Sequence, residues 1–222
     1  ALSGWLDLNG TVVTSSGTTA LHLSLEALGI GPGDEVILPS YVCQAALNPI
    51  YHAGARPVLA DVDPETMCLS PETVRPVLTD ETALIILVHA FGYPADTKAF
   101  AQFDVPVLDD ICQAMGTCRE GQHVGQHGRM AVGSMYATKQ LAAGYGGFVS
   151  SDNPALIDEL RDLKQYDKRK HFRVTYNYSL SDLHAAMGLE QLDKLPRHLK
   201  HHRAIAREYD DCVVLAFPSD HL

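Results

Sequence analysis

The chain has 222 residues, of which 46% are hydrophobic and 20% are charged, and its formal net charge is −10. Such a composition is typical of a globular protein with one large core. The negative charge argues against a protein built to bind nucleic acid or an anionic membrane, since both require a concentrated cationic face. The five cysteines are scattered and form no CxxC pair, which favours a reducing, cytoplasmic environment. The longest apolar run, residues 83–88, is too short to cross a bilayer.

Seven short apolar runs, rich in Val and Ile, recur along the chain. Most are apolar throughout, which is typical of strands that are covered on both faces. Helical patterns lie between several of them, at residues 18–28 and at residues 44–52, which Gly54 closes. The alternation predicts a three-layer α/β fold, in which helices cover both faces of a mostly parallel seven-stranded sheet. The expected strands are residues 12–14, 35–39, 57–62, 83–89, 105–108, 131–136 and 147–150.

The character of the sequence changes near Ser179, where a long helical pattern begins that continues to Tyr209. Pro196 is expected to kink or divide this helix. After Asp211 the residues suggest a new strand. We therefore expect one large domain at residues 1–195, followed by a linker helix and the start of a smaller domain at residues 196–222.

Three groups of polar residues follow expected strands, where parallel α/β sheets bind their ligands. The first is the turn Ser16-Gly17-Thr18, which resembles a phosphate cradle, although an ordinary helix N-cap is the commoner explanation of such a turn. The second is the pair Asp109 and Asp110, with Gln113 one helical turn later. A carboxylate here could bind a protonated ring nitrogen or a metal, or simply cap the next helix.

The third group is Ser134 to Lys139, in which a lysine lies just beyond an apolar strand and could attack a carbonyl. Pyridoxal phosphate (PLP) requires all three groups: donors for its phosphate, an anion for its pyridinium nitrogen and an amine for its aldehyde. A dinucleotide-binding fold is the weaker interpretation, because GxGxxG is absent and Lys139 would have no role. The histidines of residues 198–202 predict a polar helix face and not a metal site.

Six stretches of the chain, in this order, resemble the DegT/DnrJ/EryC1/StrS sugar aminotransferases, which are PLP enzymes of fold type I. The resemblance runs from Thr14 to Tyr209. Several such motifs in the family's order make chance convergence improbable. The stretches are SSGTTALHLSLEALGIGPGDEVILPS (15–40), GARPVLADVDPET (54–66), HAFGYPAD (89–96), LDDICQAMG (108–116), SMYATKQLAAGYGG (134–147) and YNYSLSDLHAAMGLEQLDKL (176–195).

The resemblance implies a role for each matching residue. Lys139 would be the catalytic residue that forms a Schiff base with PLP, Asp110 would bind the pyridinium nitrogen, and Gln113 would contact the side of the ring that bears the hydroxyl. Asn177 would reach the phosphate bound by a neighbouring subunit, which implies a homodimer with shared active sites. The phosphate itself would be bound by Ser16, Gly17, Thr18 and Ser134.

The chain departs from the family at a few positions. Similar enzymes place an aromatic residue at Cys43 to stack on the PLP ring, and Tyr41 is the nearest substitute here. Tyr145 replaces a residue that is often acidic, and Ser179 replaces a common arginine, so substrate binding is expected to differ. Similar enzymes also have a segment before the first strand and a whole smaller domain after the long helix, of which this sequence contains only the start.

The resemblance implies an aminotransferase that transfers an amino group from an amino acid, by analogy glutamate, to a keto sugar attached to a nucleotide. The small-molecule substrates would be this amino donor and the keto sugar. A PLP-dependent sugar dehydratase is the lesser enzyme alternative, because those relatives have histidine in place of Lys139. A catalytically impaired PLP-binding or regulatory homologue is the alternative outside catalysis, prompted by the short C-terminal part and by Cys43.

Overall fold

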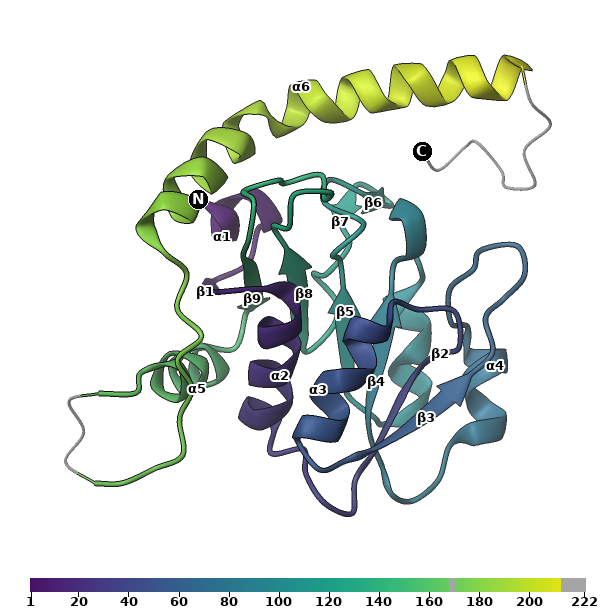
Figure 1. Cartoon of the computed structure of the whole chain (residues 1–222). Helices are drawn as coiled ribbons and strands as arrows, with labels where there is room; N and C mark the ends of the chain where they lie inside the picture. The colour runs from purple at the N-terminus through teal and green to yellow at the C-terminus, as the bar shows by residue number, and fades with distance from the viewer. Residues whose placement is uncertain (168–170, 213–222) are drawn as a thin grey trace.

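The computed structural model describes residues 1–167 and 171–212. Its centre is a sheet of seven strands in the order β1-β9-β8-β5-β4-β2-β3 (Figure 1). Their bounds are β1 (Gly10–Thr14), β2 (Glu35–Pro39), β3 (Arg56–Ala60), β4 (Thr82–Val88), β5 (Val107–Asp110), β8 (Met130–Ser134) and β9 (Gly147–Ser151). All seven expected strands are therefore confirmed, with bounds shifted by a few residues. A two-stranded hairpin, β6 (Cys118–Arg119) and β7 (Gln122–His123), was not predicted.

The sheet is mostly parallel, as expected. Strands β8, β5, β4, β2 and β3 pair in parallel, whereas β9 runs antiparallel to both β1 and β8. The central strands are buried along their lengths, which explains why they read as continuous apolar runs in the sequence. The parallel strands end at one edge of the sheet, and the polar groups that follow them meet there.

Helices cover both faces of the sheet, which gives the expected three layers (Figure 1). On one face, α2, α3 and α5 pack through Leu23, Ile50 and Leu160. On the other face, buried Leu6 and Leu195 belong to one cluster and Val74 to a second. The helices are α1 (Leu2–Leu6), α2 (Gly17–Leu28), α3 (Leu47–His52), α4 (Pro71–Val74), α5 (Pro154–Lys164) and α6 (Asp182–Cys212), with 3-10 turns at Gln44–Ala46, Arg75–Val77, Ala90–Gly92 and Thr97–Phe103.

Local sequence determines where helix α2 begins and ends. Ser16 caps its N-terminus through a reciprocal pair of bonds with Thr19, and Gly29 ends it in the left-handed conformation at φ 75°. Helix α5 begins at the cap Asn153 and buries Ile157, Leu160 and Leu163. Helix α5 was not predicted, although this spacing is typical of an amphipathic helix.

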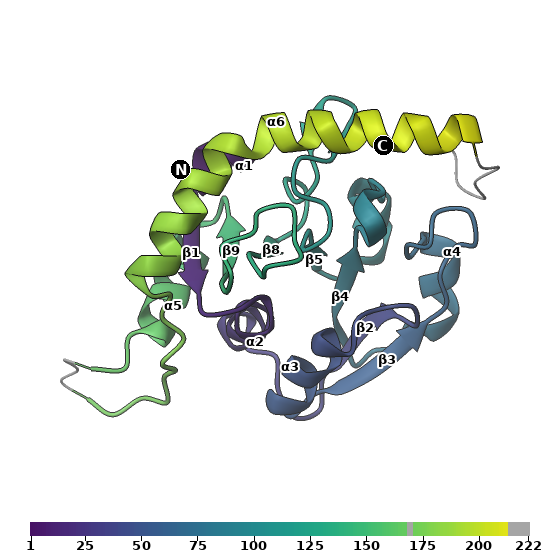
Figure 2. The same cartoon turned by 45° about the horizontal axis from the view of Figure 1, so that its top comes forward.

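Helix α6 is a single helix that includes Pro196, so the proline does not divide it. The helix bends along its course and passes α1 (Figure 2). Beyond the proline, Arg203 Nη2 donates to the carbonyl of Gly116 at 3.3 Å, and Leu199 packs against the same glycine. The strand expected after Asp211 lies outside the described residues. None of the described helices is long and apolar enough to cross a membrane.

A glycine in β8 is needed for the packing of the sheet. A Cβ atom at Gly133 would lie 2.1 Å from Cζ of Phe148, which is fully buried. We expect Gly133→Ala to lower the free energy of unfolding by about 1–3 kcal/mol, because a buried ring must move. Thermal or urea unfolding measures the effect.

Gly4→Ala is the matched control, because a Cβ atom there meets nothing within 4 Å. It should leave stability unchanged or slightly raised, since alanine favours a helix. Replacing Phe148 by leucine should restore part of the stability of Gly133→Ala. Equal stability of Gly133→Ala and the wild type would contradict this packing.

Candidate functional site

A cavity of about 700 Å³ opens where β1, β4, β5 and β8 end. Its volume is within the range of small-molecule sites. The lining brings together residues from the three expected groups, which are spread along the chain from Ser16 to Lys139. Of the predicted site residues, those that line it are Ser16, Gly17, Thr18, Tyr41, Cys43, Asp110, Gln113, Ser134 and Lys139.

One end of the cavity is formed by the first turn of α2. The Ser16 side chain accepts from Thr19 N at 3.1 Å, so this hydroxyl is engaged in capping. Gly17 and Thr18 also line the cavity, and first-turn N–H groups have no partner within their own helix. A Cβ atom at Gly17 would lie 3.0 Å from that of Ser134. Glycine thus keeps backbone donors open to the cavity, as an anion site at a helix N-terminus requires.

The two aspartates at the end of β5 have different environments. Asp109 is fully buried and accepts bonds from Thr97 Oγ1 at 2.7 Å and Gly128 N at 2.9 Å. Its Oδ1 also lies 3.1 Å from His89 Nε2. Asp110 lines the cavity instead, and its Oδ1 accepts from Cys112 N at 2.9 Å. Of the two aspartates, only Asp110 is placed to meet a ligand.

The side chain of Gln113 is oriented by a neighbouring turn. Its Oε1 accepts a bond from Phe91 N at 3.0 Å, so its amide group is directed elsewhere and is available as a donor. Phe91 has the left-handed φ of 54°, an uncommon conformation for a bulky residue. It is 61% exposed and lines the cavity. Phe91 was not predicted, because a sequence does not reveal a positive φ at a residue other than glycine.

Lys139 lies in a loop that is bonded on both sides. Its own N donates to Tyr136 O at 2.9 Å, and Nε2 of the next residue, Gln140, donates to Gln113 O at 2.6 Å. The loop that carries the lysine is thereby joined to the segment that follows Asp110. Tyr136 and Tyr145 form an aromatic wall beside the lysine, with ring centroids 5.4 Å apart.

A thiol lies at the position where an aromatic residue was expected to stack on the ring of the cofactor. Cys43 is exposed and lines the cavity, and Tyr41 lies nearby with its ring 6.0 Å from that of Phe91. Cys112 lines the cavity too, but burial, and then the Asp110 carboxylate, raise the pKa of its thiol well above the usual value. The site therefore contains one accessible thiol and one that is held neutral.

Asn177 is the only predicted site residue that does not line this cavity among the described residues. It is exposed in the segment between α5 and α6. This position agrees with a role outside its own chain's site, and the role itself stays a prediction.

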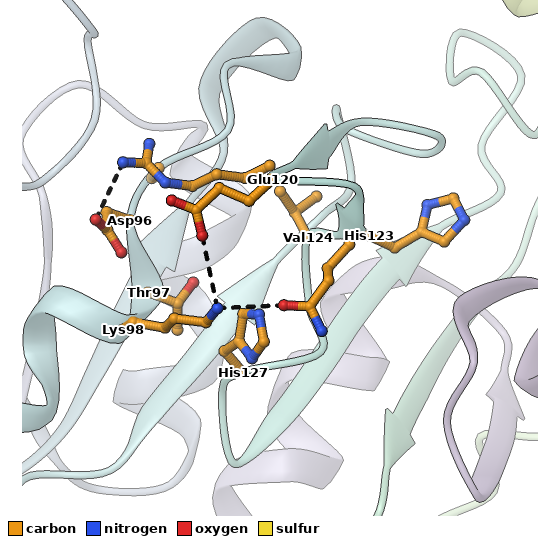
Figure 3. A pocket seen from close by; sticks show the side chains of 10 residues that line it. Asp96, Thr97, Lys98, Glu120, His123, Val124 and His127 are labelled. Atoms are coloured by element: carbon orange, nitrogen blue, oxygen red, sulfur yellow. Dashed lines mark hydrogen bonds and ion pairs between the residues drawn. The ribbon is translucent and has the colours of Figure 1, made fainter.

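A second, smaller hollow lies beside the β6–β7 hairpin (Figure 3). Lys98 Nζ there donates to Gln122 Oε1 at 3.2 Å and lies 3.8 Å from Glu120 Oε2. The volume of this smaller hollow, about 20 Å³, is enough for roughly one water molecule. No group of three possible metal ligands occurs among the described residues. The large cavity is therefore the candidate site.

Comparison with known proteins finds one matching family and several similar solved structures. The model of the DegT/DnrJ/EryC1/StrS aminotransferase family matches residues 1–214. The aminotransferase TlmJ from Streptoalloteichus hindustanus is 33% identical at a TM-score of 0.88, over 94% of this chain and 60% of its own. S. venezuelae DesV, solved in complex with a ketimine intermediate, is 32% identical at a TM-score of 0.88, and the match covers 93% of this chain and 58% of DesV. NtdA from Bacillus subtilis, solved with bound cofactor PMP, is 27% identical at a TM-score of 0.85, and the match covers 94% of this chain and 49% of NtdA.

The accessibility of the cysteines tests the geometry of the cavity. We expect iodoacetamide at neutral pH to alkylate Cys43 and to leave Cys112 and Cys68 largely unmodified. Burial raises the pKa of Cys68 to about 11 and that of Cys112 well above its usual value. The reactive thiolate fraction falls about tenfold for each unit by which the pKa rises above the pH.

Peptide mass spectrometry after timed labelling measures the rates residue by residue. Cys43→Ser should remove the fast cavity signal and leave the signal of exposed Cys118. Equal labelling of Cys43 and Cys112 would contradict the closed position of Cys112.

Proposed function

The chain belongs to the DegT/DnrJ/EryC1/StrS aminotransferase family, and from this we propose that it is part of a PLP-dependent aminotransferase. It would transfer an amino group from an amino acid, by analogy glutamate, to a keto sugar attached to a nucleotide. The observation that carries the proposal is the single cavity that Lys139, Asp110 and Gly17 line together. The chain spans about half to three-fifths of the length of the solved relatives.

The lining residues fit the three chemical parts of PLP. First-turn N–H groups of Gly17 and Thr18, with the hydroxyl of Ser134, would bind the phosphate. The carboxylate of Asp110 would pair with the protonated pyridine nitrogen, and the amide of Gln113 would donate to the ring hydroxyl. Bound PLP supplies an electron sink for bond changes at the carbon atom of the substrate.

Lys139 would have two tasks. Its Nζ would bond to the carbonyl of the cofactor and hold it in the cavity. When it is not attached to the cofactor, the same Nζ would move the proton at the substrate carbon that bears the amino group. The bonds from its loop to Tyr136 and Gln113 limit the movement of the lysine backbone. Tyr136 and Tyr145 would contact the substrate beside it.

We further propose a homodimer in which Asn177 of one copy completes the phosphate site of the other. Its exposed position outside its own cavity supports this arrangement. The scattered cysteines support a cytoplasmic location. Residues 1–195 would form the PLP-binding domain, and residues 196–222 would lead into a smaller one.

A PLP-binding homologue without turnover is the second candidate. It is favoured by Cys43, which lines the cavity at the position where relatives stack an aromatic residue on the ring. Such a protein would bind PLP and would not convert any amino donor. The two candidates therefore differ in one measurable step.

The test is spectroscopic. Wild-type protein loaded with PLP should show the visible absorption band of a lysine-bound cofactor, and glutamate should abolish this band. Lys139→Ala should lack the band and should slow the reaction with the donor by about 10²-fold or more, the effect of losing a positioned proton-transfer group.

Lys200→Ala, an exposed lysine on α6, is the matched control and should behave as the wild type. A Lys139→Ala variant that keeps the band would overturn the assignment of the lysine. A wild-type band that no amino donor changes would favour the homologue without turnover.

A further inference from the structure

The segment that carries Asn177 is attached to the large domain at several points. Running from beyond α5 up to α6 (Figure 1), it forms no helix or strand of its own at residues 171–181. Arg173 pairs with Glu159 and Asp162 of α5. Tyr176 N donates to Leu163 O at 2.9 Å. We call residues 173–178 the arm.

The last three residues of the arm alternate in exposure, as side chains along a strand do. Tyr176 and Tyr178 are half-buried, with their rings stacked at a centroid distance of 5.0 Å, while Asn177 between them is exposed. The carbonyl of Tyr178 also accepts a bond from Ser15 N at 2.9 Å. Ser15 directly precedes the turn that lines the phosphate end of the cavity. The arm is thus hydrogen-bonded to the residue before the turn of residues 16–18 in its own chain, which we call the phosphate turn.

A buried histidine on α2, His22, contacts both tyrosines of the arm. His22 Nδ1 lies 2.9 Å from Tyr178 Oη, and its ring meets that of Tyr176 at 5.0 Å. Burial lowers the pKa of His22, so the ring is neutral at neutral pH. Glu26 Oε1 lies 3.5 Å from Nε2, which has no hydrogen bond, and the charge of the carboxylate favours the proton on that nitrogen. Nδ1 is then the acceptor, and the Tyr178 hydroxyl is the donor.

We propose that the His22–Tyr178 hydrogen bond is a positioning contact, which holds Asn177 outward so that its amide meets the cofactor phosphate bound by a second copy of the chain. This inference rests on the shared site of the proposed function. A segment without regular structure would otherwise have to be ordered when the phosphate binds, at a cost in affinity. The anchors on α2 and α5 order it beforehand.

The test compares two ligands that differ only in phosphate. Binding of PLP and of pyridoxal to the cofactor-free protein is measured for the wild type, Tyr178→Phe and Asn177→Ala. Both variants should weaken PLP binding by about 3- to 10-fold, the effect of one hydrogen bond, and leave pyridoxal binding unchanged. The double variant should bind PLP no more weakly than Asn177→Ala, because both changes act through one contact.

Three further variants separate positioning from general stability. Tyr51→Phe, at an exposed tyrosine of α3, should bind both ligands as the wild type does. His22→Leu should weaken PLP binding as Tyr178→Phe does, and His22→Asn, which keeps an acceptor near Nδ1, should retain more of it.

Each contrary result has a distinct meaning. Equal loss of PLP and pyridoxal binding in Tyr178→Phe would show a purely structural role and overturn the inference. Loss of PLP binding in Asn177→Ala alone would overturn the positioning role and leave the shared site standing. No phosphate-selective loss in Asn177→Ala would overturn the shared site and the inference with it, whereas a wild type that binds neither ligand would overturn the proposed function.

Discussion

Two adjacent residues of a β-strand face opposite sides of the sheet, and this constraint organises the end of β5. Asp109 faces the interior, where Thr97, Gly128 and His89 surround its carboxylate. A buried carboxylate is stable only with such donors, so Asp109 fixes the strand end in one position. Asp110 must then face the cavity. A Cβ atom at Gly128 would lie 2.7 Å from Asp109 Oδ2, so glycine is needed for this packing.

The same alternation recurs in the arm. Tyr176 and Tyr178 turn toward α2, and Asn177 between them faces outward. In both places one side chain makes the structural contacts and its neighbour is left for a ligand. The bond from Ser15 to the carbonyl of Tyr178 connects the arm to the turn before α2. A displacement of either segment would therefore affect the other.

The sequence allowed the strands and nine of the 21 residues that line the cavity to be predicted, because buried parallel strands read as apolar runs and their carboxyl ends converge. Other features depend on geometry that residue types do not encode. Nothing in the sequence indicates the left-handed backbone of Phe91. The use of the Ser16 hydroxyl as a cap, by contrast, is the commoner explanation of its turn, and the structure shows it. Helix α5 is different, because the spacing of Ile157 and Leu160 is typical of an amphipathic helix and is visible in the sequence.

The presence of Cys43 in place of an aromatic residue is expected to weaken cofactor binding and not to abolish it. An aromatic contact contributes about 0.5–1.5 kcal/mol beyond the area that it buries, so losing this specific contribution would weaken binding by about tenfold. The phosphate turn, Asp110 and Lys139 are independent of that wall, since they lie on α2, β5 and the loop after β8. Tyr41 and Phe91 supply rings nearby. Cys43 therefore argues for an altered ring contact and not for the loss of the site.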